Sequence, residues 1–412
     1  METHLADFIR DTTAGREAEE ILRRCVHCGF CTATCPTYQL LGDELDGPRG
    51  RIYLIKQVLE GVQPTAKTRL HLDRCLSCRA CETTCPSGVF FTRLLDIGRE
   101  VVERKVPRTG GDGIMRGLLN RLVPRAALFG AAMKMAQAVR LMLPGTLRAK
   151  VPPLSAAGPV PQGIHARRLI ALAGCVQPSM FPNINGAAQR VLDRLGIQLI
   201  EENTAGCCGA VRMHLNDVAG ARDDARRNID AWWPLLESGA EGLVMTASGC
   251  ASHLLEYAYL LQDDPDYAVK AARVVLATRD ISEIITAEAA GLTPLLQACG
   301  PLPESERLLA FHSPCSLQHG LKIHGTVESL LSAAGYKLTA VADAHLCCGS
   351  AGTYSVLQPV LSQRLLNHKI VALTAGAPSM IVSANVGCIG HLQGATALPV
   401  KHWIEVLDAR LS

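Results

Sequence analysis

One cysteine pattern occurs twice near the start of this 412-residue chain and constrains the fold more than any other feature. The segments CVHCGFCTATCP at 25–36 and CLSCRACETTCP at 75–86 both read Cys-x2-Cys-x2-Cys-x3-Cys-Pro. With this spacing, three thiolates of one run hold one iron–sulfur cubane and the fourth binds the other. The proline after each fourth cysteine ends the local turn and helps direct that thiol away from its own triplet.

The two runs therefore predict two [4Fe-4S] clusters, each of which takes three ligands from one run and its fourth ligand from the other. The expected ligands are Cys25, Cys28, Cys31 and Cys85 for the first cluster, and Cys35, Cys75, Cys78 and Cys81 for the second. Zinc sites also use Cys-x2-Cys, but zinc gives no reason for the whole pattern to occur twice. The 39 residues between Cys35 and Cys75 include DGPRGRIYLIKQVLEG, where a Gly/Pro turn opens an amphipathic helix. This insert favours a helical two-cluster domain over a compact β-rich one.

The composition agrees with a globular protein that keeps its thiols reduced. The chain has 17 cysteines, 48% apolar residues and a mean hydropathy of +0.16, which exclude a disordered chain. A chain of this size does not need disulfides, so the cysteines are better explained as metal ligands or redox groups in a cytoplasmic protein. The net charge of +3 is too small to indicate nucleic acid.

A second repeat fills the rest of the chain. The segment RRLIALAGCVQPS at 167–179 corresponds to ERLLAFHSPCSLQ at 306–318, and AGCCGA at 205–210 corresponds to LCCGSA at 346–351. Each half alternates apolar strand-like runs with amphipathic helices and ends an apolar run at a further cysteine. This order predicts parallel βαβ units, in which functional groups gather beyond the carboxyl ends of the strands.

Each repeat offers four more candidate ligands around a Cys-Cys-Gly sequence. These candidates are Cys175, Cys207, Cys208 and Cys250 in the first repeat, and Cys315, Cys347, Cys348 and Cys388 in the second. Adjacent cysteines can face one site only from a loop, where glycine allows a positive φ and a close approach of the backbone. An iron–sulfur centre, zinc, thiol chemistry and plain structural cysteines all remain open. His253 and His391 are further candidate ligands, and Cys299 is expected to be buried and inert.

The tandem cysteine runs followed by two Cys-Cys-Gly modules resemble the iron–sulfur subunits of 2-hydroxy-acid and glycerol-3-phosphate dehydrogenases and of heterodisulfide reductase. The segments AGCCGAV, NIDAWWP, TASGC, HLCCGSAGTY and KHWIE are most similar to the glycolate oxidase (glycolate dehydrogenase) iron–sulfur subunit family. The resemblance implies partner subunits that contain FAD and oxidise glycolate to glyoxylate, and a chain that passes electrons toward quinone. Both modules here end in Cys-x2-His rather than the wider family's Cys-x2-Cys, which argues against a five-thiolate noncubane cluster.

The residues themselves support an electron carrier without a substrate site of its own. No G-x-G-x-x-G opens a helix and no P-loop occurs, so nothing indicates a flavin or nucleotide site, and we assign no catalytic residue. The alternatives are the corresponding subunit of a lactate or glycerol-3-phosphate dehydrogenase, and a thiol-disulfide reductase. A third alternative is a Cys-Cys-Gly half that zinc stabilises without a redox role.

The expected organisation is α+β, with a helical two-cluster ferredoxin domain (1–110), a connector and Pro-rich linker (111–164), and two CCG modules with parallel sheets (165–300 and 301–412). From 113 to 150 the connector has seven basic residues, no acid and many interspersed apolar residues. A basic amphipathic helix of this kind can lie on an anionic membrane surface, which predicts peripheral attachment to the inner membrane. Docking to a partner protein is the equal alternative.

Overall fold

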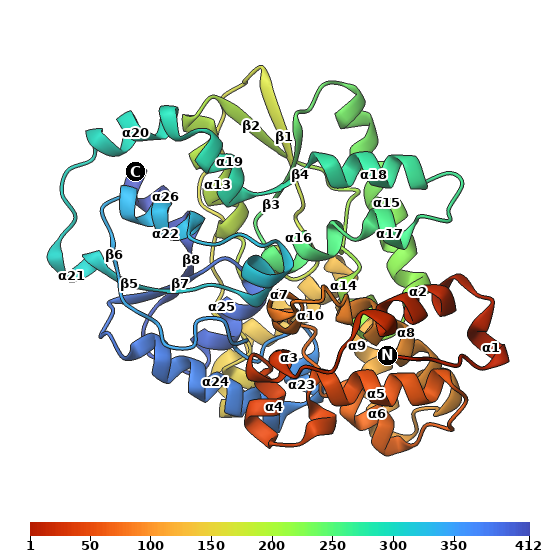
Figure 1. Ribbon diagram of the computed structural model, residues 1–412. Coiled ribbons are helices and arrows are strands. Elements are labelled where there is room, and N and C mark those ends of the chain that lie inside the picture. The colour runs from red at the N-terminus through yellow and green to blue at the C-terminus, as the bar shows by residue number, and fades with distance from the viewer. The chain divides into compact units, whose positions relative to one another are not determined.

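The computed structural model describes residues 1–412, except for the side chain of residue 146. The chain forms two compact units, coloured by residue number in Figure 1. The first unit comprises Met1–Gly117 and His345–Lys369, and the second comprises Leu118–Ala344 and Ile370–Ser412. The sequence-based division kept 301–412 together, whereas this division places the second Cys-Cys-Gly segment in the first unit.

The first unit is helical. Thr12 caps one of its helices by accepting a hydrogen bond from the Gly15 amide at 3.0 Å, and Pro36 and Pro48 stand at helix starts, where a missing N–H costs nothing. Its elements are α1 (Asp7–Arg10), α2 (Thr13–Arg24), α3 (Phe30–Ala33), α4 (Pro36–Leu41), η1 (Glu44–Asp46), α5 (Pro48–Leu59), α6 (Ala66–Asp73), α7 (Ala80–Thr84), α8 (Phe91–Lys105), most of α9 (Gly110–Leu122), α23 (Tyr354–Leu357) and most of α24 (Pro359–Thr374).

The core of the first unit lies between α5 and α8. Ile55 on α5 and Leu94 and Leu95 on α8 are fully buried. Gly98 allows the two helices to approach closely, because a Cβ there would stand 2.6 Å from the Ile55 side chain. The amphipathic helix expected in the insert between the cysteine runs is therefore α5, and the prediction of a helical domain is confirmed.

The second unit contains two four-stranded parallel sheets, in the orders β2-β1-β3-β4 and β6-β5-β7-β8. The predicted parallel sheets are confirmed, and β4 and β8 add a short fourth strand to the three expected in each half. The strands are β1 (Arg167–Ala171), β2 (Ile197–Glu201), β3 (Gly242–Met245), β4 (Thr278–Asp280), β5 (Leu308–His312), β6 (Lys337–Leu338), β7 (Met380–Ser383) and β8 (Val400–His402).

Helices connect these strands and cover both repeats (Figure 1). On the first sheet, Trp232 and Ile229 of one helix are fully buried against the strand residue Ile170. The helices are α10 (Ala126–Ala138), η2 (Arg140–Met142), α11 (Gly145–Arg148), α12 (Gln177–Met180), α13 (Asn183–Arg194), α14 (Ala210–His214), α15 (Val218–Glu237), α16 (Ser248–Leu254), α17 (Tyr257–Leu260), α18 (Ala268–Ala277), α19 (Ile281–Ala287), α20 (Ala289–Ala298), α21 (Glu304–Arg307), the π-helix η3 (Ser316–Gly320), α22 (Thr326–Ala333), α25 (Val386–Gln393) and α26 (Trp403–Leu411).

The carboxyl ends of β3 and β7 join the two repeats. The Gly249 amide donates to Asn385 Oδ1 at 3.1 Å, and the Ser248 amide donates to the Ala384 carbonyl at 3.2 Å. His402 Nε2 lies 2.8 Å from the Thr246 carbonyl, and burial lowers the pKa of His402 to about 4, so the neutral ring donates this bond. The strand ends that carry the cysteines are thus fixed against each other.

The expected linker at 151–164 has no helix or strand, as its prolines and glycines predict. Among the described residues, no helix combines the length and hydrophobicity needed to cross a bilayer.

Candidate metal centres

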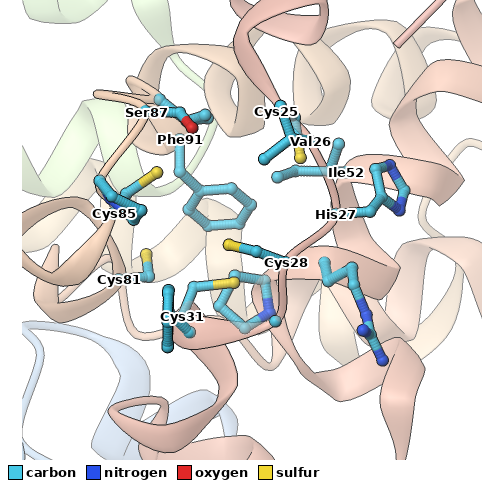
Figure 2. Close-up of a pocket in the computed structure, with 16 residues that line it drawn as sticks. Cys25, Val26, His27, Cys28, Cys31, Ile52, Cys81, Cys85, Ser87 and Phe91 are labelled. Carbon is cyan, nitrogen blue, oxygen red and sulfur yellow. The ribbon is translucent and has the colours of Figure 1, made fainter.

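The first four N-terminal candidates line one open pocket, which Cys81 of the second set also lines. Cys25 and Cys85 each follow a helix, α2 and α7, whereas Cys31 lies in α3. Figure 2 shows the sulfur atoms of Cys25, Cys28, Cys31 and Cys85 turned toward a common space beside the Phe91 ring. Burial, together with the nearby Cys25 and Cys85 thiols, raises the pKa of Cys31 to about 11. We call this set the first quartet.

The other four candidates line a second open pocket. Cys35 caps α4 and Cys81 lies in α7, while Cys75 and Cys78 belong to the loop between α6 and α7. Burial raises the pKa of Cys81, and Cys78, Cys75 and Cys35 add to this by electrostatic repulsion. We call this set the second quartet. The structure thus places the fourth cysteine of each run with the first three of the other.

The loops around the quartets adopt the same strained conformation. His27 and Ser77 occupy equivalent positions and have φ of 55° and 52°, and Gly29 and Arg79 follow with 85° and 62°. A left-handed conformation costs a non-glycine residue about 1–3 kcal/mol, so three such residues here indicate a functional constraint. In the second loop the Ser77 amide donates to Cys75 Sγ at 3.4 Å. Four soft donors around each cavity, with the backbone wrapped close, fit an iron–sulfur cluster.

The second quartet lies beside a buried ionic network. Arg51 is 1% exposed, donates to Thr37 Oγ1 at 3.1 Å and lies 3.5 Å from the buried Asp46 carboxylate. The Thr37 hydroxyl in turn lies 3.3 Å from Cys35 Sγ. Arg74 pairs with the other Asp46 oxygen at 2.7 Å. Arg51 and Arg74 therefore share the Asp46 carboxylate, and Thr37 connects Arg51 to the candidate ligand Cys35.

A third arginine holds the other side of the second quartet. Arg99 is 7% exposed and donates to the Leu72 and Cys75 carbonyls at 2.8 and 2.9 Å. It also donates to Ser77 Oγ at 3.2 Å. The first quartet differs, because its nearby Arg49 is partly exposed and pairs with Glu44 at 2.6 Å.

The first repeat brings its four cysteines together in the second unit. Cys207 accepts hydrogen bonds from the Cys175 and Cys208 thiols, which lowers its pKa well below the usual cysteine value. The Gly209 amide adds a bond to Cys207 Sγ at 3.4 Å. Cys208 also contacts Cys250, and its hydrogen bond with Cys207 raises its own pKa. The four thiols, three of them buried and Cys250 partly exposed, thus form a continuous chain that can stabilise a thiolate.

Two polar residues that the sequence did not indicate hold this loop. Asn228 on α15 donates to the Cys207 carbonyl at 2.8 Å and accepts from the Gly206 amide at 2.8 Å. Tyr257 donates to the Cys208 carbonyl at 2.8 Å, and both side chains are fully buried. Asn228 belongs to the NIDAWWP segment, which was informative only through the family resemblance.

The glycine expected in each Cys-Cys-Gly loop is required by the backbone. Gly209 has φ of +94° and Gly349 has φ of +88°. A Cβ at Gly349 would lie 2.7 Å from the Ser362 carbonyl oxygen, so no other residue fits without movement. Ser362 Oγ also donates to the Gly349 carbonyl at 2.8 Å, which anchors the loop to α24.

The second repeat has its candidates in both units. Cys347 and Cys348 lie buried in the first unit, in the loop after β6. Cys315 and Cys388 belong to the second unit, where Cys315 precedes η3 and Cys388 lies in α25. Asn385 Nδ2 donates to Cys388 Sγ at 3.4 Å and so links the Cys388 thiol to the Gly249 amide of the first repeat.

Within the first unit, Tyr354 connects the second quartet with the Cys-Cys-Gly loop. Its hydroxyl donates to the Arg74 carbonyl at 3.1 Å. Burial raises the pKa of Tyr354, and the Cys75 and Cys347 thiols raise it further. The phenol is therefore within electrostatic reach of a candidate ligand from each set.

The remaining candidates are placed as follows. His253 lies next to the first Cys-Cys-Gly loop, because its Nε2 is 3.1 Å from the position of a Cβ on Gly209. Its ring also contacts Tyr257 edge to face, with centroids 5.9 Å apart. His391 is in the last turn of α25. Cys299 is partly exposed rather than buried, because it caps the end of α20 near the surface, with its thiol donating to the Leu295 carbonyl at 3.2 Å.

Comparison with known proteins agrees with this geometry. Residues 21–89 match a family described as a 4Fe-4S dicluster domain, and residues 170–255 and 309–393 each match a cysteine-rich domain. The chain is 51% identical over its whole length to the glycolate oxidase iron-sulfur subunit of Escherichia coli, covering 99% of that protein. The chain belongs to this family of iron–sulfur subunits.

Two more distant relatives are also similar to this chain. The probable glycolate oxidase iron-sulfur subunit of Bacillus subtilis is 29% identical over 91% of this chain and 89% of that protein. Lactate utilization protein A of Bacillus pumilus is 25% identical over 57% of this chain and 97% of that protein. Family membership confirms the predicted fold class and makes the chain an iron–sulfur electron-transfer protein of the oxidoreductase class.

Proposed function

We propose that this chain transfers electrons within a complex that oxidises glycolate to glyoxylate, from FAD on a partner subunit toward the quinone pool. The observation that carries the proposal is the pair of interlocked cysteine quartets, each of which lines one of two adjoining pockets that share Cys81. Bound [4Fe-4S] clusters would accept and release single electrons there. Cys25, Cys28, Cys31 and Cys85 would hold one cluster, and Cys35, Cys75, Cys78 and Cys81 the other.

The same proposal assigns metal centres to the two CCG modules. In the first module, Cys175, Cys207, Cys208 and Cys250 already share hydrogen bonds as four thiols would before losing protons to a metal. Cys207 is fully buried and Cys208 is 3% exposed. A disulfide substrate needs an accessible thiolate, so this burial favours a metal centre over thiol-disulfide exchange.

The substrate is tested on the complex isolated through a tag on this chain. We expect a flavin in the co-purified partner, and reduction of the iron–sulfur EPR signals by glycolate faster than by lactate or glycerol 3-phosphate. Reduction by lactate alone would overturn the assignment to glycolate. Absence of glycolate-dependent reduction in a complex that contains flavin and all its clusters would overturn the electron-transfer role.

The metal content of the CCG modules is tested on anaerobically purified chain. We expect more than roughly eight iron atoms per chain, the number that two cubanes account for. Iron should fall in both Cys208→Ser and Cys348→Ser. A content of about eight iron atoms, unchanged in both variants, would remove the CCG centres and leave the two N-terminal clusters. Stoichiometric zinc would instead support a structural role.

The connector supports peripheral attachment to a membrane. Several of its large apolar side chains are exposed, and Leu141 and Met142 are 84% and 86% exposed. Arg116 does not belong to the basic surface that the sequence predicted, because it is buried and pairs with Asp112 and Asp73 at 3.2 and 3.3 Å. The exposed cations Arg121, Arg125 and Lys134 remain, each contributing about 1 kcal/mol near an anionic surface.

Attachment is tested with the full-length protein and vesicles of phosphatidylcholine with and without phosphatidylglycerol. We expect binding that needs the anionic lipid and is released by high salt. The double variant Leu141→Glu/Met142→Glu should bind less, whereas Val269→Glu, at an 80% exposed position on α18, should bind normally. Equal binding by all three proteins would overturn the assignment to the connector.

A further inference from the structure

A buried histidine distinguishes the second CCG module from the first. His312 is the last residue of β5 and stands three residues before Cys315, and the first module has Leu172 three residues before Cys175. Both side chains are buried, with His312 2% exposed and Leu172 4% exposed. Burying an imidazole has a cost that burying leucine does not, so the second module needs a compensating interaction at this position.

The neighbouring strand β7 also carries a polar residue where the first module has an apolar one. Ser383 pairs with His312 across β5 and β7 and is fully buried. It stands five residues before Cys388, and the first module has the buried Met245 five residues before Cys250. The first module thus has an apolar pair beside its cysteines, and the second has a polar pair in its place.

The polar pair points toward a cysteine. His312 Nδ1 lies 2.9 Å from Ser383 Oγ, which fixes the orientation of the ring. A ring nitrogen of His312 lies within 4.8 Å of Cys388 Sγ, a separation at which one metal ion can bind both atoms. Histidine ligands characteristically use their other ring nitrogen to contact an oxygen atom that orients the ring. Ser383 occupies that role here.

We propose that His312 is a nitrogen ligand of the metal centre in the second CCG module, next to Cys388. The proposal rests on the proposed function, because it requires that the CCG modules hold metal centres. It makes the two centres chemically different: the first has thiolates from its four cysteines, and in the second the neutral His312 imidazole takes the place of one thiolate. This position was not indicated by the Cys-x2-His pattern, which points to His253 and His391.

Mixed ligation changes the reduction potential of the second centre. Replacing anionic thiolate ligands by neutral imidazole raises the reduction potential of an iron–sulfur centre, as in clusters that have two histidine ligands on one iron. The second centre should therefore be easier to reduce than the first. Electrons that reach this part of the chain should collect in the second module.

The test uses full-length chain purified without oxygen, with iron analysis and pulsed EPR of its reduced centres. Wild-type protein is prepared once with natural histidine and once with ¹⁵N-histidine. We expect more than roughly eight iron atoms and a strong nitrogen coupling that changes from ¹⁴N to ¹⁵N with the label. The coupling should disappear in His312→Leu, which carries the residue of the first module, and persist in His253→Leu and His391→Leu.

Redox titration gives a second measurement. In His312→Leu and in His312→Gln, which retains a polar group for Ser383, the midpoint potential of one centre should fall. A tenfold change in its reduction equilibrium corresponds to 59 mV for a one-electron couple. If His312→Leu does not fold, His312→Gln still tests the proposal.

The outcomes separate the two proposals. Two results would overturn the role of His312 and leave the CCG centres in place. One is more than eight iron atoms without any histidine coupling. The other is a coupling that is lost in His391→Leu or His253→Leu rather than in His312→Leu. Iron at about eight atoms would overturn the CCG centres and the role of His312 together.

Discussion

The two N-terminal quartets have the same ligand spacing but different surroundings. Cys28 of the first quartet is exposed, and the apolar residues next to it, Val26 and Phe30, are more than 60% exposed. The second quartet has Cys35 and Cys81 buried beside Arg51 and Arg99. The spacing thus determines where iron can bind, while the rest of the unit determines how stable, accessible and reducible each centre is.

The largest expected difference is between loss of a buried ligand and loss of an exposed one. Cys81→Ser should remove the second cluster and unfold much of the first unit, because Cys81 is part of its hydrophobic core and metal binding is coupled to folding. Cys28→Ser should remove only the first cluster, about four iron atoms. Iron analysis with hydrogen exchange measures both effects. Equal protection of α5 in the two variants would show that the quartets support the fold equally.

The next difference concerns two arginines that lie two positions apart on α5. Arg51→Met leaves the buried Asp46 with fewer partners and should destabilise the first unit by about 3–5 kcal/mol, the cost of breaking a buried ion pair. Arg49→Met removes only a partly exposed pair with Glu44 and should cost at most about 1 kcal/mol. Hydrogen exchange of the α5 amides measures both. Similar losses would mean that Arg74 and His71, which also contact the Asp46 carboxylate, satisfy it without Arg51.

Much of this structure follows from short-range sequence patterns. The exchanged quartets follow from two cysteine runs and their prolines, and the parallel sheets follow from the alternation of strands and helices. A Cys-Cys-Gly loop requires a positive φ at its glycine, which Gly209 and Gly349 show. These features depend on residues that are close in the sequence, so their spacing carries the information.

Other features depend on residues that only folding brings together. Thr37, Asp46 and Arg51 are ordinary polar residues in the sequence, and their network with Arg74 exists because η1, α5 and α6 converge. Arg116 looked like part of a basic face, but it pairs with Asp73 from a distant helix. The strands β4 and β8 have three residues each, too few to give a periodic pattern.

A kinetic difference should accompany the difference in burial. Under air or a strong iron chelator, the first cluster should be lost before the second, because Cys28 is exposed and Cys81 is buried. EPR spectra recorded during the exposure distinguish the clusters after assignment with Cys28→Ser. The first signal should decay faster in wild type, and the remaining signal should match that of Cys28→Ser. Simultaneous loss would mean that solvent reaches both cavities equally.

The smallest expected effect comes from one hydroxyl group. In the structure the Thr37 hydroxyl donates to the Asp46 carbonyl at 2.8 Å and lies 3.3 Å from Cys35 Sγ. When Cys35 is a thiolate ligand, we expect this hydroxyl to turn its one proton to the sulfur, and hydrogen bonds to ligand sulfur raise the reduction potential. A net hydrogen bond of about 0.5–1.5 kcal/mol corresponds to roughly 20–60 mV for one electron. Thr37→Val should lower the potential of the second cluster by that amount.

Ser87 provides the matched control for this variant, because it stands two residues after Cys85 as Thr37 stands two residues after Cys35. Ser87→Ala should leave the second cluster's potential unchanged in the same EPR-monitored titration. If both variants shift the second cluster equally, the effect is not local to the Cys35 contact. If neither shifts it, Arg51 acts on the cluster through its charge alone, because the hydroxyl between Arg51 and the sulfur then contributes nothing measurable.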